Sequence, residues 1–191
     1  MCITFSNFAQ AENMLIDSNV FYTIPDAGGS DNFHTGKIVN VNFNYYTLPW
    51  LTITGGFFFS EEIADNTRSD IVGTFQASIE TRGLALGVRP EYKFSERNKI
   101  YNKSGFLYYN TKVKVDEFFE AGLPIGSSSA STNGYGFFIS FGWEHSLTQS
   151  VTFQLELGTQ KQLDLFDGKT TPDRVFDLTT TGFSVGIGYR F

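Results

Sequence analysis

Apolar and polar residues alternate, one for one, along six segments of this chain. Successive side chains of a β-strand point to opposite faces, so this alternation predicts strands with one apolar and one polar face. The apolar positions are Val39, Val41, Phe43 and Tyr45; Leu51, Ile53, Phe57 and Phe59; Leu84, Leu86, Val88, Tyr92 and Phe94; Tyr135, Phe137, Ile139, Phe141 and Trp143; Val151, Phe153, Leu155 and Leu157; and Phe183, Val185, Ile187, Tyr189 and Phe191.

Two further segments complete an even number of strands. Residues 99–113 are predicted to form one strand, and the face on which Lys103 lies decides which of its side chains point toward lipid. A lysine facing lipid at the middle of a bilayer costs about 2–4 kcal/mol, so Lys103 is expected on the polar face, with Ile100, Phe106 and Tyr108 on the other. Residues 13–24 are expected to form the first strand, although their alternation is poor.

The polar face decides whether the apolar face meets a protein core or lipid. A soluble antiparallel barrel packs its large apolar residues inside and displays charges outside. Here the polar face is rich in Gly, Ser, Thr, Asn and Gln, with few charges, and the apolar face of the six segments carries no charge. This predicts an all-β, transmembrane, antiparallel up-and-down β-barrel of eight strands, formed by residues 12–191.

The connections alternate between short and long. The short ones are Leu48-Pro49, residues 95–98 and residues 145–150, and the long ones are residues 25–35, 61–81, 117–133 and 164–180. All short turns therefore fall at one end of the barrel, as in bacterial outer-membrane barrels, which have short periplasmic turns and longer extracellular loops. The Gly- and Ser-rich residues 126–134 are expected at a loop tip.

The first eleven residues are predicted to be the remnant of a signal peptide. Ala9-Gln10-Ala11 has the small-x-small pattern of a cleavage site, although the basic and most of the apolar part of a signal are absent. The alternative is that Ile3 and Phe5 belong to a first strand.

Composition narrows the class of protein further. The 191 residues fit one domain, and 17% of them are aromatic, too many for a disordered chain. A single Cys excludes a disulfide framework. The net charge of −6 argues against a nucleic-acid partner. No apolar run approaches the length of about 18 residues that a membrane-spanning helix needs.

The last ten residues carry a family resemblance. Residues 182–191 resemble the closing strand of small outer-membrane β-barrels, in which a terminal Phe with apolar residues at alternate positions before it is read by the barrel assembly machinery. Phe191, Tyr189 and Ile187 match that signal. Residues 100–113 and 134–160 resemble the fifth to seventh strands of the same group.

From about residue 36 to its end, the chain resembles the eight-stranded family that includes the membrane domain of outer membrane protein A and the neisserial opacity proteins. The resemblance implies the outer membrane of a Gram-negative bacterium, with periplasmic termini and extracellular long loops. It also implies lipid, lipopolysaccharide and the assembly machinery as partners. A host or surface partner would bind at residues 61–81, 117–133 and 164–180.

Charged residues of the polar face would meet inside a narrow barrel. They are Arg89, Glu91, Lys93, Lys103, Glu144, Glu156 and Arg190. Because buried charges must pair, we interpret them as a static network of salt bridges that fills the lumen. The alternative is a gate for conduction, which has been proposed for relatives.

Catalysis has little support in the sequence. His34 follows Asp31 in a long loop, and His145 adjoins Ser146 in a short turn, but neither arrangement specifies an active site. Residues 164–168 have the chemistry of a hairpin turn and too few oxygen ligands for calcium. No enzyme, cofactor or metal is expected.

The prediction for function is therefore an integral outer-membrane protein with a structural or surface-interaction role exerted through its loops. One alternative is a narrow, porin-like channel for small solutes. A second is a soluble, lipocalin-like ligand-binding barrel.

Overall fold

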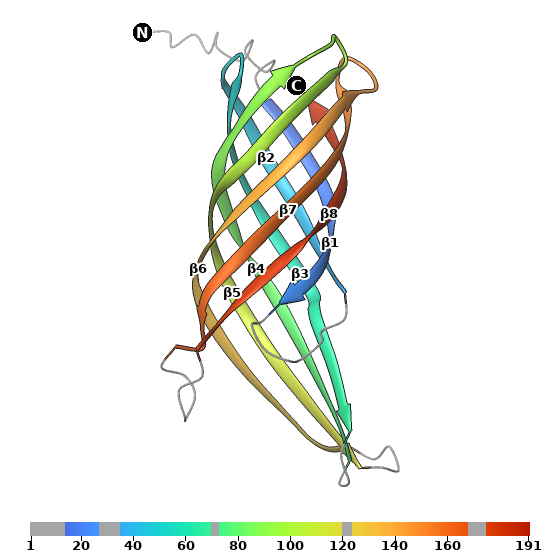
Figure 1. The fold of residues 1–191 in the computed structure, drawn as a ribbon, viewed down its shortest axis with the longest axis vertical. Coiled ribbons are helices and arrows are strands. Elements are labelled where there is room, and N and C mark those ends of the chain that lie inside the picture. Colours follow the sequence, from blue (N-terminus) through green and yellow to red (C-terminus); the bar gives the residue numbers. More distant parts are fainter. Residues whose placement is uncertain (1–13, 27–34, 70–72, 120–123, 168–174) are drawn as a thin grey trace, which may run out of the picture.

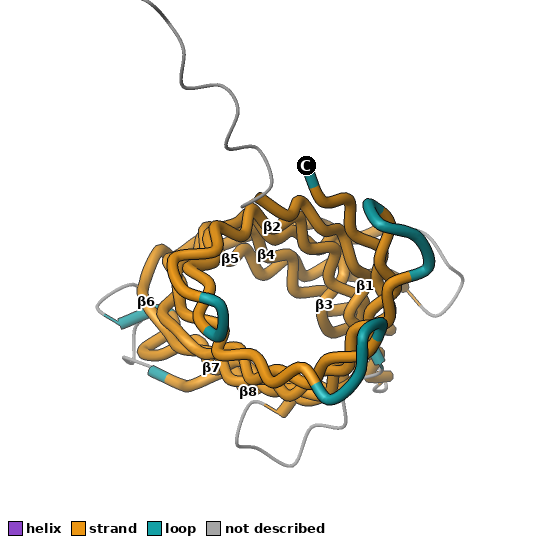
Figure 2. The backbone as a smooth tube through the Cα atoms, turned by 90° about the horizontal axis from the view of Figure 1, so that it is seen from above, coloured by secondary structure: helices purple, strands orange, loops and turns teal. Residues whose placement is uncertain are grey.

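The chain folds into a closed barrel of eight antiparallel strands, seen along its axis in Figure 2. The computed structural model describes residues 14–26, 35–69, 73–119, 124–167 and 175–191. The strands are β1 (Met14–Asp26), β2 (Gly36–Leu48), β3 (Leu51–Ser69), β4 (Gly73–Lys93), β5 (Asn98–Phe119), β6 (Pro124–Ser146), β7 (Val151–Leu165) and β8 (Phe176–Arg190). Each strand pairs with the next, and β1 closes the barrel by pairing with β8. The predicted fold class and strand count are confirmed.

The large apolar side chains point out of the barrel. Leu86, Phe106 and Ile187 are 64%, 77% and 58% exposed. Buried positions are instead occupied largely by Thr, Asn, Gln, Ser and charged residues. This is the orientation that the charge-free apolar face predicted, and it gives the barrel an outer belt suited to hydrocarbon.

The first strand also has an inner polar face and an outer apolar face, although its sequence alternates poorly. Asp17, Asn19 and Thr23 are buried inside, while Leu15 and Phe21 share that inner face. Because apolar residues stand on both faces of β1, its alternation is poor.

Inward glycines make room for inward rings and branched side chains. Tyr101 lies opposite Gly142, and Tyr109 lies opposite Gly134. A Cβ atom added to Gly142 would come within 2.2 Å of the Tyr101 ring. The glycines of the polar face are therefore a packing requirement of a narrow barrel.

Two of the predicted long loops are mostly strand, and this corrects the sequence interpretation. In residues 61–81, β3 continues to Ser69 and β4 begins at Gly73. In residues 117–133, β5 continues to Phe119 and β6 begins at Pro124, so residues 126–134 lie within a strand. No lipid-facing apolar stripe marks these extensions, because their outward positions, such as Asn110, Lys112 and Lys114 on β5, are polar.

These extensions form a sheet that projects beyond the rest of the barrel. In Figure 1 the ends of β3, β4, β5 and β6 continue past the other strands, at the end of the barrel opposite the C-terminus. We call this part, which comprises the described residues of 61–78 and 112–131, the projecting sheet. It stays paired throughout, with Asn66 opposite Ala77 and Val115 opposite Ser128.

The three short turns lie at the same end of the barrel as the C-terminus (Figure 1). The connection predicted over residues 164–180 is shorter than expected, because β7 ends at Leu165 and β8 begins at Phe176. The predicted signal remnant, residues 1–11, lies outside the described residues. In the described ranges, no helix is long and apolar enough to cross a membrane.

Candidate functional site: the filled lumen

Three groups of inward side chains fill the barrel from the short-turn end to the long-loop end. The charge cluster comprises Arg89, Glu91, Lys99, Glu144 and Arg190. The polar chamber is a cavity of about 70 Å³ that Lys103 and Glu156 border on one side and that Phe58, Leu107 and Phe138 also line. The apolar plug comprises Phe21, Ile38, Phe58, Ile79, Leu107, Tyr109, Leu165, Phe166 and Leu178.

Glu144 on β6 is the centre of the charge cluster. Its carboxylate accepts hydrogen bonds from Arg89 Nη2 at 2.5 Å and from Arg190 Nη2 at 3.1 Å, and Lys99 Nζ lies 3.5 Å away. Gln154 Nε2 donates a fourth contact at 3.3 Å. Glu144 has no exposed surface, so these partners replace its hydration.

Glu91 on β4 supplies the second negative charge of the cluster. It lies 3.1 Å from Arg89 Nε and 2.7 Å from Lys99 Nζ. Lys99 also donates to the Tyr46 hydroxyl at 3.2 Å. The five charges thus form one connected network drawn from β4, β5, β6 and β8.

Arg89 is held by an aromatic face as well as by carboxylates. Its guanidinium carbon lies 3.8 Å from the centre of the Tyr101 ring, and the side chain is fully buried. The position of that ring depends on Gly142 opposite it, as described above. The stacked, planar contact is one that Arg makes better than Lys.

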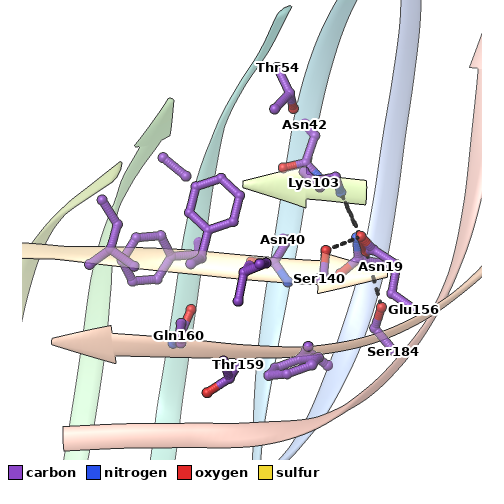
Figure 3. Close-up of a pocket in the computed structure, with 17 residues that line it drawn as sticks. Asn19, Asn40, Asn42, Thr54, Lys103, Ser140, Glu156, Thr159, Gln160 and Ser184 are labelled. Atoms are coloured by element: carbon purple, nitrogen blue, oxygen red, sulfur yellow. Dashed lines mark hydrogen bonds and ion pairs between the residues drawn. The ribbon is translucent and has the colours of Figure 1, made fainter. Parts of the chain in front are cut away.

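Lys103 and Glu156 form a second ion pair beside the polar chamber, shown in Figure 3. Lys103 Nζ lies 3.0 Å from Glu156 Oε1. The hydroxyls of Ser140 and Ser184 donate to the same carboxylate at 3.0 and 3.3 Å. Lys103 therefore points inward, in agreement with its predicted place on the polar face.

Asp17 on β1 is a buried carboxylate held by amides. Asn42 and Asn44 on β2 donate to its two oxygens at 2.7 and 2.6 Å. With Asp17 included, the described lumen holds four cations (Arg89, Lys99, Lys103, Arg190) and four anions (Asp17, Glu91, Glu144, Glu156), so its formal charges cancel.

The structure differs from the sequence interpretation at three charged residues. Lys93 was expected on the inner face, but it lies exposed beside the short turn, opposite Lys99, and makes no ion pair with the described residues. Lys99 joins the charge cluster instead. It lies on the same face of β5 as Lys103, and this spacing could have predicted its inward position. Asp17 was missed because β1 alternates poorly.

The apolar plug was also missed, because it comes from the face that is otherwise polar. Leu165 and Phe166 follow a bulge in β7 and turn into the barrel, where Phe166 stacks on Phe176 at 6.0 Å. Tyr109 donates its hydroxyl hydrogen to the Leu163 carbonyl. Phe166 has a φ of 65°, a conformation that a bulky residue adopts only when its surroundings hold it there.

The remaining candidates that the structure describes have separate contacts. His145 Nδ1 lies 2.9 Å from the Asn98 side-chain oxygen, and His34 lies outside the described residues. Phe191 packs against Tyr189 at 4.9 Å, and its amide donates to the Met14 carbonyl. Within the described ranges, no three His, Cys, Asp or Glu side chains are grouped as metal ligands.

A closed eight-stranded barrel, apolar outside and filled by paired charges inside, defines an integral outer-membrane β-barrel protein of Gram-negative bacteria. The chain belongs to the family described as "Outer membrane protein beta-barrel domain", whose profile matches residues 1–191. Comparison with curated protein sequences gave no match.

Solved structures of the same fold include three bacterial outer-membrane barrels. The attachment invasion locus protein Ail of Yersinia pestis is 13% identical, with a TM-score of 0.54, covering 94% of this chain and 99% of that one. Neisserial surface protein A is 12% identical, with a TM-score of 0.61, covering 93% and 97%. OprG of Pseudomonas aeruginosa is 10% identical, with a TM-score of 0.52, covering 94% and 96%.

Proposed function

We propose that this protein is a surface-interaction barrel that presents the projecting sheet outside the cell and neither conducts solutes nor catalyses a reaction. The short turns and the C-terminus would face the periplasm. The long connections and the projecting sheet would face the outside, beyond lipopolysaccharide. The observation that carries the proposal is the length of β3 to β6 beyond the apolar belt.

A tilted strand of about 9–11 residues crosses the hydrocarbon. Strands β4, β5 and β6 have 21, 22 and 23 residues, against 13 in β1 and β2. The outward residues change from apolar to polar within each long strand, as from Tyr108 to Asn110 and Lys112 on β5. Half of each long strand is therefore available for contacts outside the membrane.

The filled lumen supports the absence of conduction. An eight-stranded barrel is about wide enough for its own side chains. Here the charge cluster closes one end and the apolar plug the other, leaving the small chamber between them. This supports the interpretation of the charges as a static network of salt bridges rather than a gate.

The chemistry of the projecting sheet suits a neutral or cationic partner. Its β6 strand is exposed and uncharged from Gly126 to Ser131. Residues 61–81, which lie mostly in the same sheet, contain five acidic residues and one Arg. On β5, Lys112 and Lys114 are balanced by Asp116 and Glu117. Ail has been crystallised with the heparin analogue sucrose octasulfate; we expect a different partner here, because an acidic surface repels polyanions.

Labelling of intact cells tests the orientation. Ser129 on the projecting sheet and Ser95 in a short turn are replaced separately by Cys and treated with a membrane-impermeant maleimide. We expect S129C to react in intact cells and S95C only after the outer membrane is opened. Labelling of S95C alone in intact cells would overturn the orientation.

A matched truncation tests whether the projecting sheet is separate from the membrane anchor. Lys112 pairs with Ser131, so removing residues 112–131 and inserting a tight turn preserves the register below. The shortened barrel is expected to insert and to keep its heat-dependent gel shift. Failure to insert would show that the sheet belongs to the anchor.

Planar-bilayer recording tests the channel alternative. We expect no discrete conductance steps from the wild-type barrel or from E144Q. Steps that change size in E144Q would favour the channel. The soluble, lipocalin-like alternative is wrong, because large apolar residues such as Leu86, Phe106 and Ile187 point out of the barrel and do not line a central ligand site.

A further inference from the structure

One outward side chain inside the apolar belt carries an amide. Between the aromatic residues at the two ends of the belt, most described outward positions are apolar or Gly, and the polar exceptions include Ser18, Asn102, Ser104 and Thr159. A Ser hydroxyl can return its hydrogen bond to nearby backbone, but an Asn amide has two donors and an acceptor to satisfy.

The Asn102 amide is only partly satisfied by the protein. Its Nδ2 donates to the backbone carbonyl of Ser140 at 3.1 Å. Its second N–H and its Oδ1 take no hydrogen bond from the described residues. In hydrocarbon an unpaired amide group costs several kcal/mol, so a partner from outside the chain would stabilise it.

Asn102 lies on the wall of a large groove on the outer face of the barrel. The groove has a volume of about 750 Å³. One wall is the paired row of outward residues Tyr92, Ile100, Trp143 and Leu155. The other is the row of Asn102, Phe141, Leu157 and Phe183. No charged side chain in these two rows faces outward.

The groove has a polar end and an apolar end at different depths in the belt. Asn102 and Trp143 lie near the short turns, where Trp143 Nε1 donates to Asn98. Phe183 lies farther along its strand from the short-turn end and stacks on Tyr22 at 5.2 Å. The groove thus climbs from the level of the interfacial Trp toward the middle of the belt, becoming wholly apolar beyond Asn102.

We propose that this groove binds one acyl chain of a diacyl glycerophospholipid from the leaflet at the short-turn end. The ester carbonyl oxygen of that chain accepts the free Nδ2–H of Asn102, and the chain runs past Phe141 and Leu157 toward Phe183. Ester carbonyls lie at the boundary of the hydrocarbon, which is the level of Asn102, just inside Trp143. A thin chain fits a groove that climbs a convex wall, whereas a second convex barrel would meet it along a line.

Native mass spectrometry of the purified full chain tests this site. The barrel is released from detergent with equal amounts of two phospholipids that share headgroup and chain length, one with ester and one with ether linkages. The ether lipid keeps the chains but lacks the acceptor carbonyl. One hydrogen bond corresponds to a preference of about two- to tenfold for the ester lipid.

The variants separate the proposal from its alternatives. N102L and N102V, checked as folded by their heat-dependent gel shift, are expected to retain both lipids equally. S18V, which removes a polar outward group on β1 away from the groove, is expected to keep the wild-type preference. Equal retention by the wild type, or an undiminished preference in both Asn102 variants, would overturn the proposal. So would a wild-type dimer that Asn102 substitution dissolves, because a second copy would then occupy the groove.

Discussion

Glu144 is the residue on which the charge cluster depends, because Arg89, Lys99 and Arg190 all contact its two carboxylate oxygens. The alternation along the strands placed six of the seven predicted charges, all but Lys93, where they meet partners within the lumen. The pairing itself could not be predicted, because it depends on how the strands are staggered around the barrel, and the stagger is not visible in one sequence.

Replacing Glu144 by Gln should destabilise the barrel strongly. Arg89 and Lys99 would then share Glu91, and Arg190 would lose its ion pair with Glu144. Breaking a buried ion pair on one side costs about 3–5 kcal/mol. Urea unfolding in lipid vesicles, followed by Trp fluorescence, measures the change. K93Q is the matched control: it removes an exposed charge of the same parity and should change the unfolding free energy by less than about 0.5 kcal/mol. Equal stability of E144Q and K93Q would contradict the role of Glu144.

Outside the belt, Asp177 and Lys161 form a cross-strand pair between β7 and β8, with Nζ and Oδ2 2.6 Å apart. The hydrogen bond from Lys161, with a second from the Asp164 amide, lowers the pKa of Asp177 below its ordinary value. A lowered pKa means that the pair stabilises the fold above the ordinary pKa of Asp and that this contribution is lost as pH falls through the lowered value.

Titration of Asp177 by NMR in micelles should therefore give a midpoint below that of a free Asp. In K161Q the midpoint should rise toward the ordinary value, because the larger of the two hydrogen bonds is gone. An unchanged midpoint in K161Q would show that Lys161 does not hold the carboxylate.

At the scale of strands, the sequence predicts best where one face meets lipid and the other is polar. The segments that cross the belt, such as Phe183 to Phe191, alternate strictly, and they were predicted correctly. Alternation is weak at the ends of β3 to β6, where the outward positions are polar. It is also weak along β1, which has apolar residues on both faces. The apolar plug was not predicted for a related reason. Phe58 of the plug, and Phe138 packed against it, stand at inward positions among polar neighbours.

The closing strand β8 carries the proposed assembly signal. Phe191 is 48% exposed and makes few contacts, mainly with Tyr189 and the Met14 carbonyl. Deleting Phe191 should therefore impair insertion in cells more than it lowers the stability of the barrel refolded in vitro. Membrane fractionation and urea unfolding of the same variant measure the two effects. Wild-type assembly in cells would argue against a terminal signal.

At the scale of the whole molecule, the barrel is ordered from the outside inward by polarity. Hydrocarbon-facing residues form the belt, small and polar residues line the wall, and balanced charges fill the lumen at the short-turn end. The hydrophobic effect therefore stabilises this fold by contact with lipid, while paired charges and the apolar plug exclude water from the interior. The projecting sheet lies outside this arrangement and is stabilised by its strand pairing.

Spin labels on adjacent positions test that order most directly. Labels are placed singly at Leu86 and Val185, which face outward, and at Ala85 and Ser184, which face inward, in barrels reconstituted into phospholipid vesicles. We expect collisions with oxygen, which concentrates in hydrocarbon, to be frequent at 86 and 185 and rare at 85 and 184. The reverse order, or equal access at all four positions, would contradict a belt that faces lipid.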